Sequence, residues 1–141
     1  MEQRLSFLTL GVRDFARALA FYRDGFGWTP IRVMDEVAFF QLPGFVFALY
    51  PRKLLAEDAN IADVGSGFSG VSLAINARDA KGVEAMLADA QRAGGKLLKP
   101  AQKTFWGGYH GYFADPDGFA WEVAYNPDIT ITDDGATVWP V

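Results

Sequence analysis

The sequence predicts an α+β fold in which two successive βαβββ modules form one structural domain. Three observations carry this prediction: apolar residues alternate with a period of two in several short runs, each half contains an amphipathic helix that begins at an Asp, and both halves have the same order of elements. The helix-initiating residues Asp14 and Asp79 are 79 − 14 = 65 residues apart, which indicates an internal duplication. Because each half alone would expose one apolar sheet face, we expect the halves to share one domain.

The first module is expected over residues 1–50. Its first strand, at residues 5–12, has one aliphatic and one mixed face, because apolar residues recur at every second position. A short amphipathic helix follows, with Asp14 as its N-cap, and Gly25 and Gly27 end it. Three further strands are expected at residues 28–33, 37–42 and 45–50.

The second half repeats this order after a segment with little periodicity, residues 51–69, which is interpreted as a linker or mobile flap. The second module is expected over residues 70–126, with Asp79 as the N-cap of its helix and a glycine pair at the end of that helix. The tail, residues 127–141, is compatible with a small extra hairpin. The remaining strands of the module are expected at residues 96–99, 111–114 and 119–125.

Composition excludes several classes of function. Half of the 141 residues are hydrophobic and 21% are charged, which is enough apolar material to build a core. A net charge of −4 and the lack of a basic run make nucleic acid an unexpected partner. The chain has no cysteine, so disulfides, thiolate metal sites and a cysteine nucleophile are excluded. Because neither a signal peptide nor an apolar run of roughly 20 residues is present, we expect a soluble, cytoplasmic protein without a membrane partner.

Two segments carry a resemblance to a known family. They are LTLGVRD at residues 8–14, continuing to Phe21-Tyr22, and GYHGYFADPDGFAWEV at residues 108–123. Through them the chain resembles the glyoxalase, bleomycin-resistance and extradiol dioxygenase group, the vicinal oxygen chelate superfamily, from Leu5 to about Pro127. The resemblance implies a curved mixed sheet around a cavity, with the helices on its outer face. It also implies a homodimer, because family cavities are often completed by pairing modules.

The resemblance also implies a metal site, to which this sequence is a poor match. Members of the family typically hold a metal on the concave face, with ligands from the first strand of each module and from later strands. The corresponding first-strand positions here are Phe7 and Gly70, or Ser72 if the register shifts by two. Glu122 is the one retained ligand position. No cofactor is therefore predicted, and a divalent metal is the alternative.

Side-chain alternation along the strands predicts which residues line the cavity. Glu122 lies between the bulky positions Trp121 and Val123 and should point inward. The single histidine, His110, should share a face with Tyr112, so that His110 and Glu122 could form a hydrogen-bonded pair, bind a ligand or act as acid and base. The cavity-lining candidates are Phe7, Thr9, Phe47, Gly70, Ser72, Trp106 and Tyr112.

Each candidate also has a structural interpretation. Glu122 is compatible with an internal hydrogen-bonding role, and a single histidine near glycines is more often a packing or surface residue. Phe47 is better interpreted as core, because aromatic residues on strands usually are. Trp106 lies in a glycine-containing loop that would suit a lid over a cavity.

Three functions stay open at this point. The first is a dimeric protein whose cavity binds a small, partly aromatic or amphipathic molecule without metal chemistry, as bleomycin-resistance members do. The second is a metal-dependent isomerase, lyase or dioxygenase of the glyoxalase kind, whose further ligands would have to come from unidentified residues. The third is a metal-free enzyme in which Glu122 and His110 act as acid and base.

Overall fold

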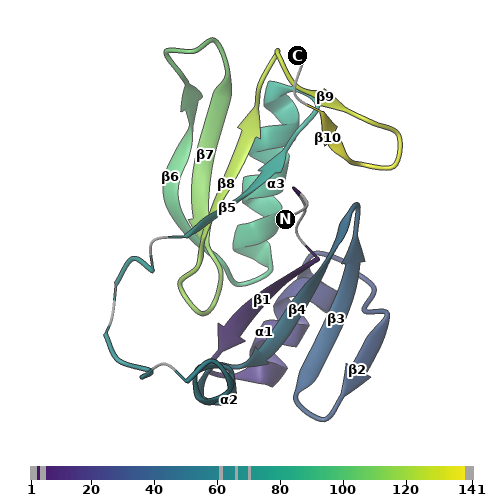
Figure 1. Cartoon of the computed structure of the whole chain (residues 1–141). Coiled ribbons are helices and arrows are strands. Elements are labelled where there is room, and N and C mark those ends of the chain that lie inside the picture. Colours follow the sequence, from purple (N-terminus) through teal and green to yellow (C-terminus); the bar gives the residue numbers. More distant parts are fainter. Residues whose placement is uncertain (1–2, 4–5, 61, 66, 70, 139–141) are drawn as a thin grey trace. The chain divides into compact units, whose positions relative to one another are not determined.

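The computed structural model describes residues 3, 6–60, 62–65, 67–69 and 71–138, and it divides into two compact units, Met1–Ser66 and Gly67–Val141. Each unit has a four-stranded mixed sheet with helical segments packed on one face (Figure 1). Both units follow the predicted βαβββ order, so the α+β fold class is confirmed. Among the described residues, no helix has the length and apolar character required to span a bilayer.

The first unit contains a sheet with strand order β1-β4-β3-β2, in which β1 and β4 are parallel. The Asp14 carboxylate accepts a hydrogen bond from the Arg17 backbone N–H and caps the first helix, as predicted. The core lies between the sheet and the helical segment, where Leu10, Val12 and Tyr22 are buried. The elements are β1 (Phe7–Val12), α1 (Phe15–Ala20), the π-helical η1 (Phe21–Gly25), β2 (Arg32–Met34), β3 (Val37–Leu42), β4 (Phe45–Pro51) and α2 (Arg52–Asp58).

Two expectations for this unit are wrong. The strand expected at residues 28–33 forms only as β2, because Trp28 leaves the strand geometry and packs in an aromatic cluster with Tyr22 and Phe47. The segment expected to lack regular structure contains α2. This helix starts directly after Pro51, and Arg52 is held against β1 because Gly11 has no side chain: a Cβ there would lie 3.1 Å from the Arg52 Cα.

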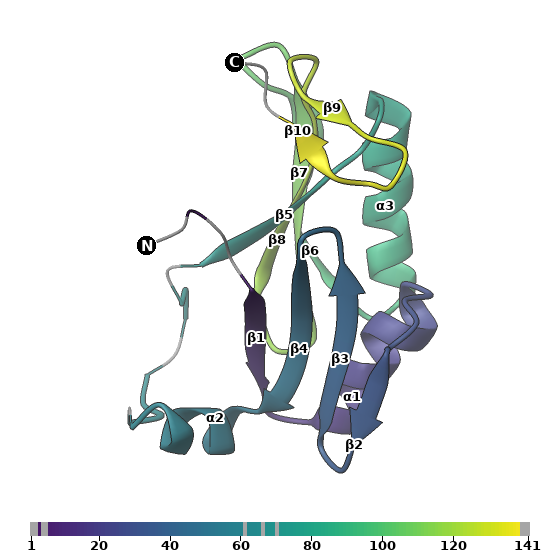
Figure 2. The same ribbon diagram turned by 45° about the vertical axis from the view of Figure 1, so that its right-hand side comes forward.

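The second unit contains a sheet with strand order β5-β8-β7-β6, and α3 packs along one of its faces (Figures 1 and 2). The Asp79 carboxylate accepts a 2.7 Å hydrogen bond from the Gly82 backbone N–H and caps α3, as predicted. The tail forms the small hairpin with which its sequence is compatible. The elements are β5 (Ser72–Asn76), α3 (Ala80–Arg92), β6 (Lys96–Lys103), β7 (Tyr109–Ala114), β8 (Ala120–Tyr125), β9 (Thr130–Ile131) and β10 (Thr137–Val138).

The core of the second unit lies between α3 and the sheet. Val83 and Leu87 of α3 are buried, as are Phe113, Trp121 and Val123 of the strands. The Phe113 and Trp121 rings stack with their centroids 6.0 Å apart. This packing leaves the other face of the sheet, which we call the open face, for the side chains at the alternate positions.

Candidate functional site

The open face of the second sheet carries the predicted site residues of β7 and β8. Gly111 faces α3, because a Cβ at that position would lie 2.6 Å from the Leu87 Cδ1. His110 and Tyr112 flank Gly111 and therefore point to the opposite face. Glu122 is directly opposite Tyr112 in the antiparallel register of β7 and β8, so it shares the open face.

His110 and Glu122 form a hydrogen-bonded pair across these strands. The His110 Nδ1 lies 2.7 Å from the Glu122 Oε1, with side chains 14% and 26% exposed. The sequence was compatible with this pair, and also with His110 and Glu122 each contacting a ligand separately. A carboxylate accepts and does not donate hydrogen bonds, so the Nδ1 carries the proton that joins the pair.

A third polar group, Lys99 of β6, completes the row. Its Nζ lies 3.0 Å from the His110 Nε2, on the other side of the imidazole from Glu122. Sequence reasoning did not single out Lys99. Lys99 is paired with Tyr112 in the β6–β7 register, which places it on the open face. The register of β6 is irregular on both sides of Lys99, so alternation along the sequence could not predict the face on which Lys99 lies.

Two aromatic rings flank the imidazole. The Trp106 and His110 ring centroids are 6.1 Å apart, and the His110 and Tyr112 centroids are 5.6 Å apart, both in edge-to-face geometry. The Trp106 indole packs against Gly108, whose missing side chain provides the space for it. The loop is closed by a 2.9 Å hydrogen bond from the Gly108 backbone N–H to the Thr104 hydroxyl. We call Lys99, Trp106, His110, Tyr112 and Glu122 the open-face cluster.

The electrostatics of the cluster act on Tyr112. Burial raises the pKa of its phenol above the ordinary value of 10.0, and the negative charge of Glu122 and a hydrogen bond with it raise the pKa further. Tyr112 therefore stays a neutral phenol that can donate a hydrogen bond.

The remaining predicted cavity residues are on β1, β4 and β5 or fall outside the described residues. Phe7 and Thr9 are exposed on the face of β1 opposite to the buried Leu10. The cavity-lining assignment of Phe47 is wrong and its core interpretation holds, since the ring is 1% exposed and lies 5.0 Å from that of Tyr22 on the helix side. Ser72 lies on β5, exposed, on the same face as Glu122. Gly70 falls outside the described residues.

The donor set of the cluster does not fit a resident divalent ion. Within the described part of the chain, no three His, Asp or Glu side chains come together in a way that could hold a metal. The His110 Nδ1 is occupied by Glu122, and a lysine ammonium lies beside the Nε2, where a cation would be repelled. Phe7 offers only hydrocarbon at the position where the family commonly has a ligand.

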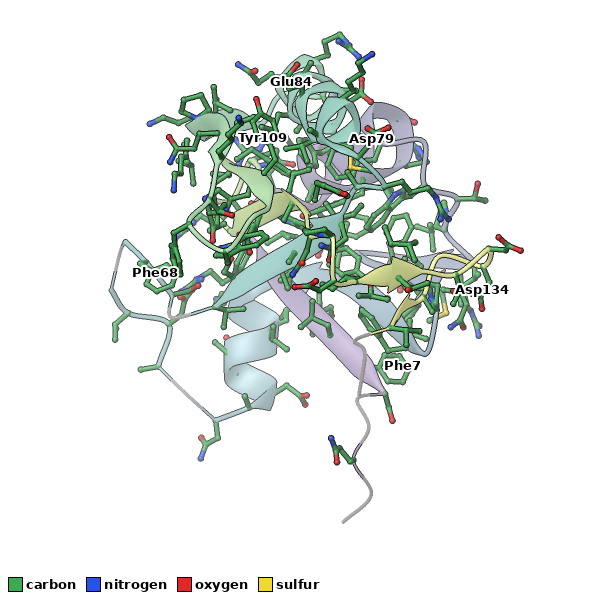
Figure 3. The ribbon with its side chains drawn as sticks, turned by 90° about the horizontal axis from the view of Figure 1, so that it is seen from above. Phe7, Phe68, Asp79, Glu84, Tyr109 and Asp134 are labelled. Atoms are coloured by element: carbon green, nitrogen blue, oxygen red, sulfur yellow. The ribbon has the colours of Figure 1, made fainter. Side chains whose placement is uncertain are left out.

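A hollow of about 350 Å³ lies at the end of the second unit near the start of α3. There Tyr109 points toward α3 and donates a 2.7 Å hydrogen bond to the Glu84 Oε1, and Figure 3 shows the two side chains close together. The lining residues are Ala80, Lys103, Thr104, Gly107, Gly108, Tyr109 and Tyr125. The loop that bears Trp106 therefore also borders this hollow.

Comparisons with known proteins agree with this fold. A glyoxalase-related enzyme from Fulvimarina pelagi is 38% identical, with a TM-score of 0.90 over 99% of this chain and 100% of that one. A glyoxalase/bleomycin resistance protein/dioxygenase family enzyme from Burkholderia phytofirmans PsJN is 20% identical, with a TM-score of 0.76 over 86% and 98% of the two chains. A lactoylglutathione lyase from Agrobacterium tumefaciens is 21% identical, with a TM-score of 0.68 over 89% and 96%.

No curated protein matches the chain significantly. The family model that matches covers residues 4–123, which is most of the sequence and includes both segments on which the resemblance was based. The chain belongs to the Glyoxalase/Bleomycin resistance protein/Dioxygenase superfamily.

Proposed function

We propose that this protein binds a small organic molecule at the open-face cluster without a resident metal ion. The observation that carries the proposal is the hydrogen-bonded row Lys99–His110–Glu122, which lies on a partly exposed sheet face with aromatic rings beside the imidazole. A few convergent polar groups among aromatic side chains are typical of small-molecule sites.

The burial of the cluster supports binding. The His110 and Glu122 side chains are 14% and 26% exposed, so they are shielded enough for specific hydrogen bonds and still reachable. The Trp106 indole and the Tyr112 phenol offer flat surfaces on which a conjugated or aromatic body could stack. Because both nitrogens of the imidazole are hydrogen-bonded in the free protein, a ligand that binds this ring must offer better partners than those it displaces.

His110 is the only histidine of the chain, so its imidazole reports on the site without ambiguity. We would titrate the protein with benzoate, phenylacetate, benzamide, phenylacetamide and glycerol, and follow the imidazole resonances by NMR. Saturable shifts with an aromatic member of this panel, lost in Trp106→Ala and kept in Phe105→Ala, are the expected result. Phe105 is the matched control because its side chain is fully exposed in the same loop. If the imidazole responds to none of the panel, binding at this cluster is refuted.

The metal-free part of the proposal has its own test. Protein purified without chelator would be analysed for Ni, Zn, Fe and Mn, and substoichiometric amounts are expected. A stoichiometric ion, lost in Glu122→Gln, would instead support the metal-dependent isomerase, lyase or dioxygenase function of the family.

A metal-free enzyme is the second candidate, and it is favoured by the 2.7 Å contact between His110 and Glu122. A carboxylate that orients an imidazole is a common arrangement for proton transfer. The 38% identical relative is named a glyoxalase-related enzyme, which supports catalysis of some kind but does not distinguish a metal-free from a metal-dependent enzyme. Turnover of a bound panel member that falls in Glu122→Gln while its Kd is unchanged would establish this function in place of simple binding.

The homodimer implied by the family also stays a prediction. Light scattering coupled to gel filtration would give twice the 15.5 kDa mass of the chain if it is correct.

A further inference from the structure

Among the described residues, the Lys99 ammonium has fewer hydrogen-bond partners than it has donors. In the described part of the chain, the imidazole Nε2 of His110, at 3.0 Å, is its one hydrogen-bond partner, and no carboxylate lies within ion-pair distance. An ammonium group has three donors, so two remain for other partners. Lys99 is half-buried, which leaves its charge only partly solvated.

The partner that Lys99 does have is a ring nitrogen and not an anionic oxygen. A lysine ammonium can only donate, so the Nε2 accepts from Lys99 and the Nδ1 donates a hydrogen bond to the Glu122 carboxylate at 2.7 Å. The ammonium makes a charge-assisted hydrogen bond to either partner, but only a carboxylate adds the attraction of an opposite charge. An anion would therefore be a better partner for this ammonium than the imidazole is.

The row is also polar along its length. Lys99 is positive at one end, Glu122 is negative at the other, and His110 lies between them. A ligand anion is attracted to the Lys99 end and repelled from the Glu122 end. The rings of Trp106 and Tyr112 both lie beside the imidazole, where they would contact the body of such a ligand.

Building on the proposed function, we infer that the ligand is a small carboxylate with a flat, apolar body, and that Lys99 is the residue that selects its charge. The carboxylate binds the ammonium of Lys99, and the flat body stacks beside Trp106 and Tyr112. Glu122 acts through His110 by holding the imidazole in the tautomer that leaves the Nε2 as an acceptor.

The test compares matched pairs of probes that differ only in charge. Benzoate and benzamide, and phenylacetate and phenylacetamide, would be titrated into the full chain, with Kd values taken from the imidazole shifts of His110. For the wild type we expect each carboxylate to bind about tenfold more tightly than its amide. In Lys99→Met this preference should fall to about twofold or less, because the charge-assisted bond is lost while the alkyl stem remains.

Two further variants keep the result interpretable. Lys99→Arg retains the charge and should retain the preference for the carboxylate, whether or not Lys99→Met folds well. Lys96→Met, on the same strand at an exposed position, should leave the preference unchanged and controls for the overall charge of the protein.

The outcomes separate this inference from the proposed function. Equal binding of acid and amide by the wild type, or an unchanged preference in Lys99→Met, overturns the assignment of Lys99 and leaves binding at the cluster intact. Binding of the amides alone overturns the carboxylate class. If neither member of either pair shifts the imidazole while glycerol does, flat carboxylates are excluded although the cluster binds a small molecule.

Discussion

The imidazole Nδ1 of His110 faces the Glu122 carboxylate at 2.7 Å, while the Nε2 of the same ring faces the Lys99 ammonium at 3.0 Å. An acceptor on one side and a donor on the other specify a single tautomer of the neutral ring, with the proton on Nδ1. An imidazole without these two neighbours is not restricted to one tautomer, so the tautomer of His110 tests the hydrogen-bonded row Lys99–His110–Glu122 directly.

We predict that the neutral ring of His110 is the Nδ1–H tautomer. A long-range ¹H–¹⁵N correlation spectrum of the protein contains signals from one histidine, so the assignment needs no comparison among residues. The double variant Lys99→Met, Glu122→Ala removes both constraints and should populate the Nε2–H form substantially. Finding the Nε2–H form as the major one in the wild type would contradict the hydrogen-bonded row.

Tyr112 provides a second prediction, because burial and the charge of Glu122 raise its pKa above 10.0. Glu122→Gln should lower this pKa but not fully to 10.0, since burial, the largest cause, persists. A raised pKa in the folded state contributes stability that is fully present below pH 10 and is lost as the pH rises through the folded value. Glu122→Gln has the smaller difference between the folded and unfolded pKa of Tyr112, so it should lose less stability than the wild type as the pH rises above 10.

Absorbance at 295 nm during a pH titration follows phenolate formation and so measures the pKa of Tyr112, with Tyr112→Phe used to identify its signal. Tyr109 is an internal control: its pKa is also raised, but chiefly by its hydrogen bond to Glu84, so Glu122→Gln should leave it unchanged. An identical titration curve in wild type and Glu122→Gln would show that Glu122 does not act on Tyr112.

Gly111 gives a third prediction, because it allows β6 to approach β7 at the irregularity that positions Lys99. A Cβ at this position would lie 2.8 Å from the Lys99 carbonyl oxygen and 2.6 Å from the Leu87 Cδ1. Gly111→Ala should lower the free energy of unfolding by about 1–3 kcal/mol, as overpacking commonly does. Urea denaturation measures the loss, and Ser72→Ala, at an exposed strand position, should change it by no more than about 0.5 kcal/mol. Equal stability of Gly111→Ala and wild type would contradict the close approach.

Local chemistry made much of this structure predictable. The caps at Asp14 and Asp79 depend only on a side chain and a backbone N–H three residues later, and both form as expected. The faces of His110 and Glu122 followed from alternation, because β7 and β8 pair in regular register.

The parts that could not be predicted depend on contacts between distant residues. The helix α2 is held where Arg52 contacts Gly11. This contact joins distant parts of the chain, so it could not be predicted from the local sequence of residues 51–69. The strand expected from Trp28 is shortened because its indole packs against Phe47. Lys99 escaped notice because the irregularities of β6 break the alternation on which the other assignments relied.

Trp106 owes its place beside His110 to Gly108, and this dependence gives the last prediction. A Cβ at position 108 would overlap the indole, so Gly108→Ala should move Trp106 away from the imidazole. The resonances of His110 should then shift toward those of Trp106→Ala, because the edge-to-face contact at 6.1 Å is lost in both variants. Phe105→Ala should leave these resonances unchanged, since the Phe105 side chain is fully exposed to solvent. Wild-type His110 signals in Gly108→Ala would show that the indole can reach the cluster without this glycine, and would remove Trp106 from the fixed part of the site.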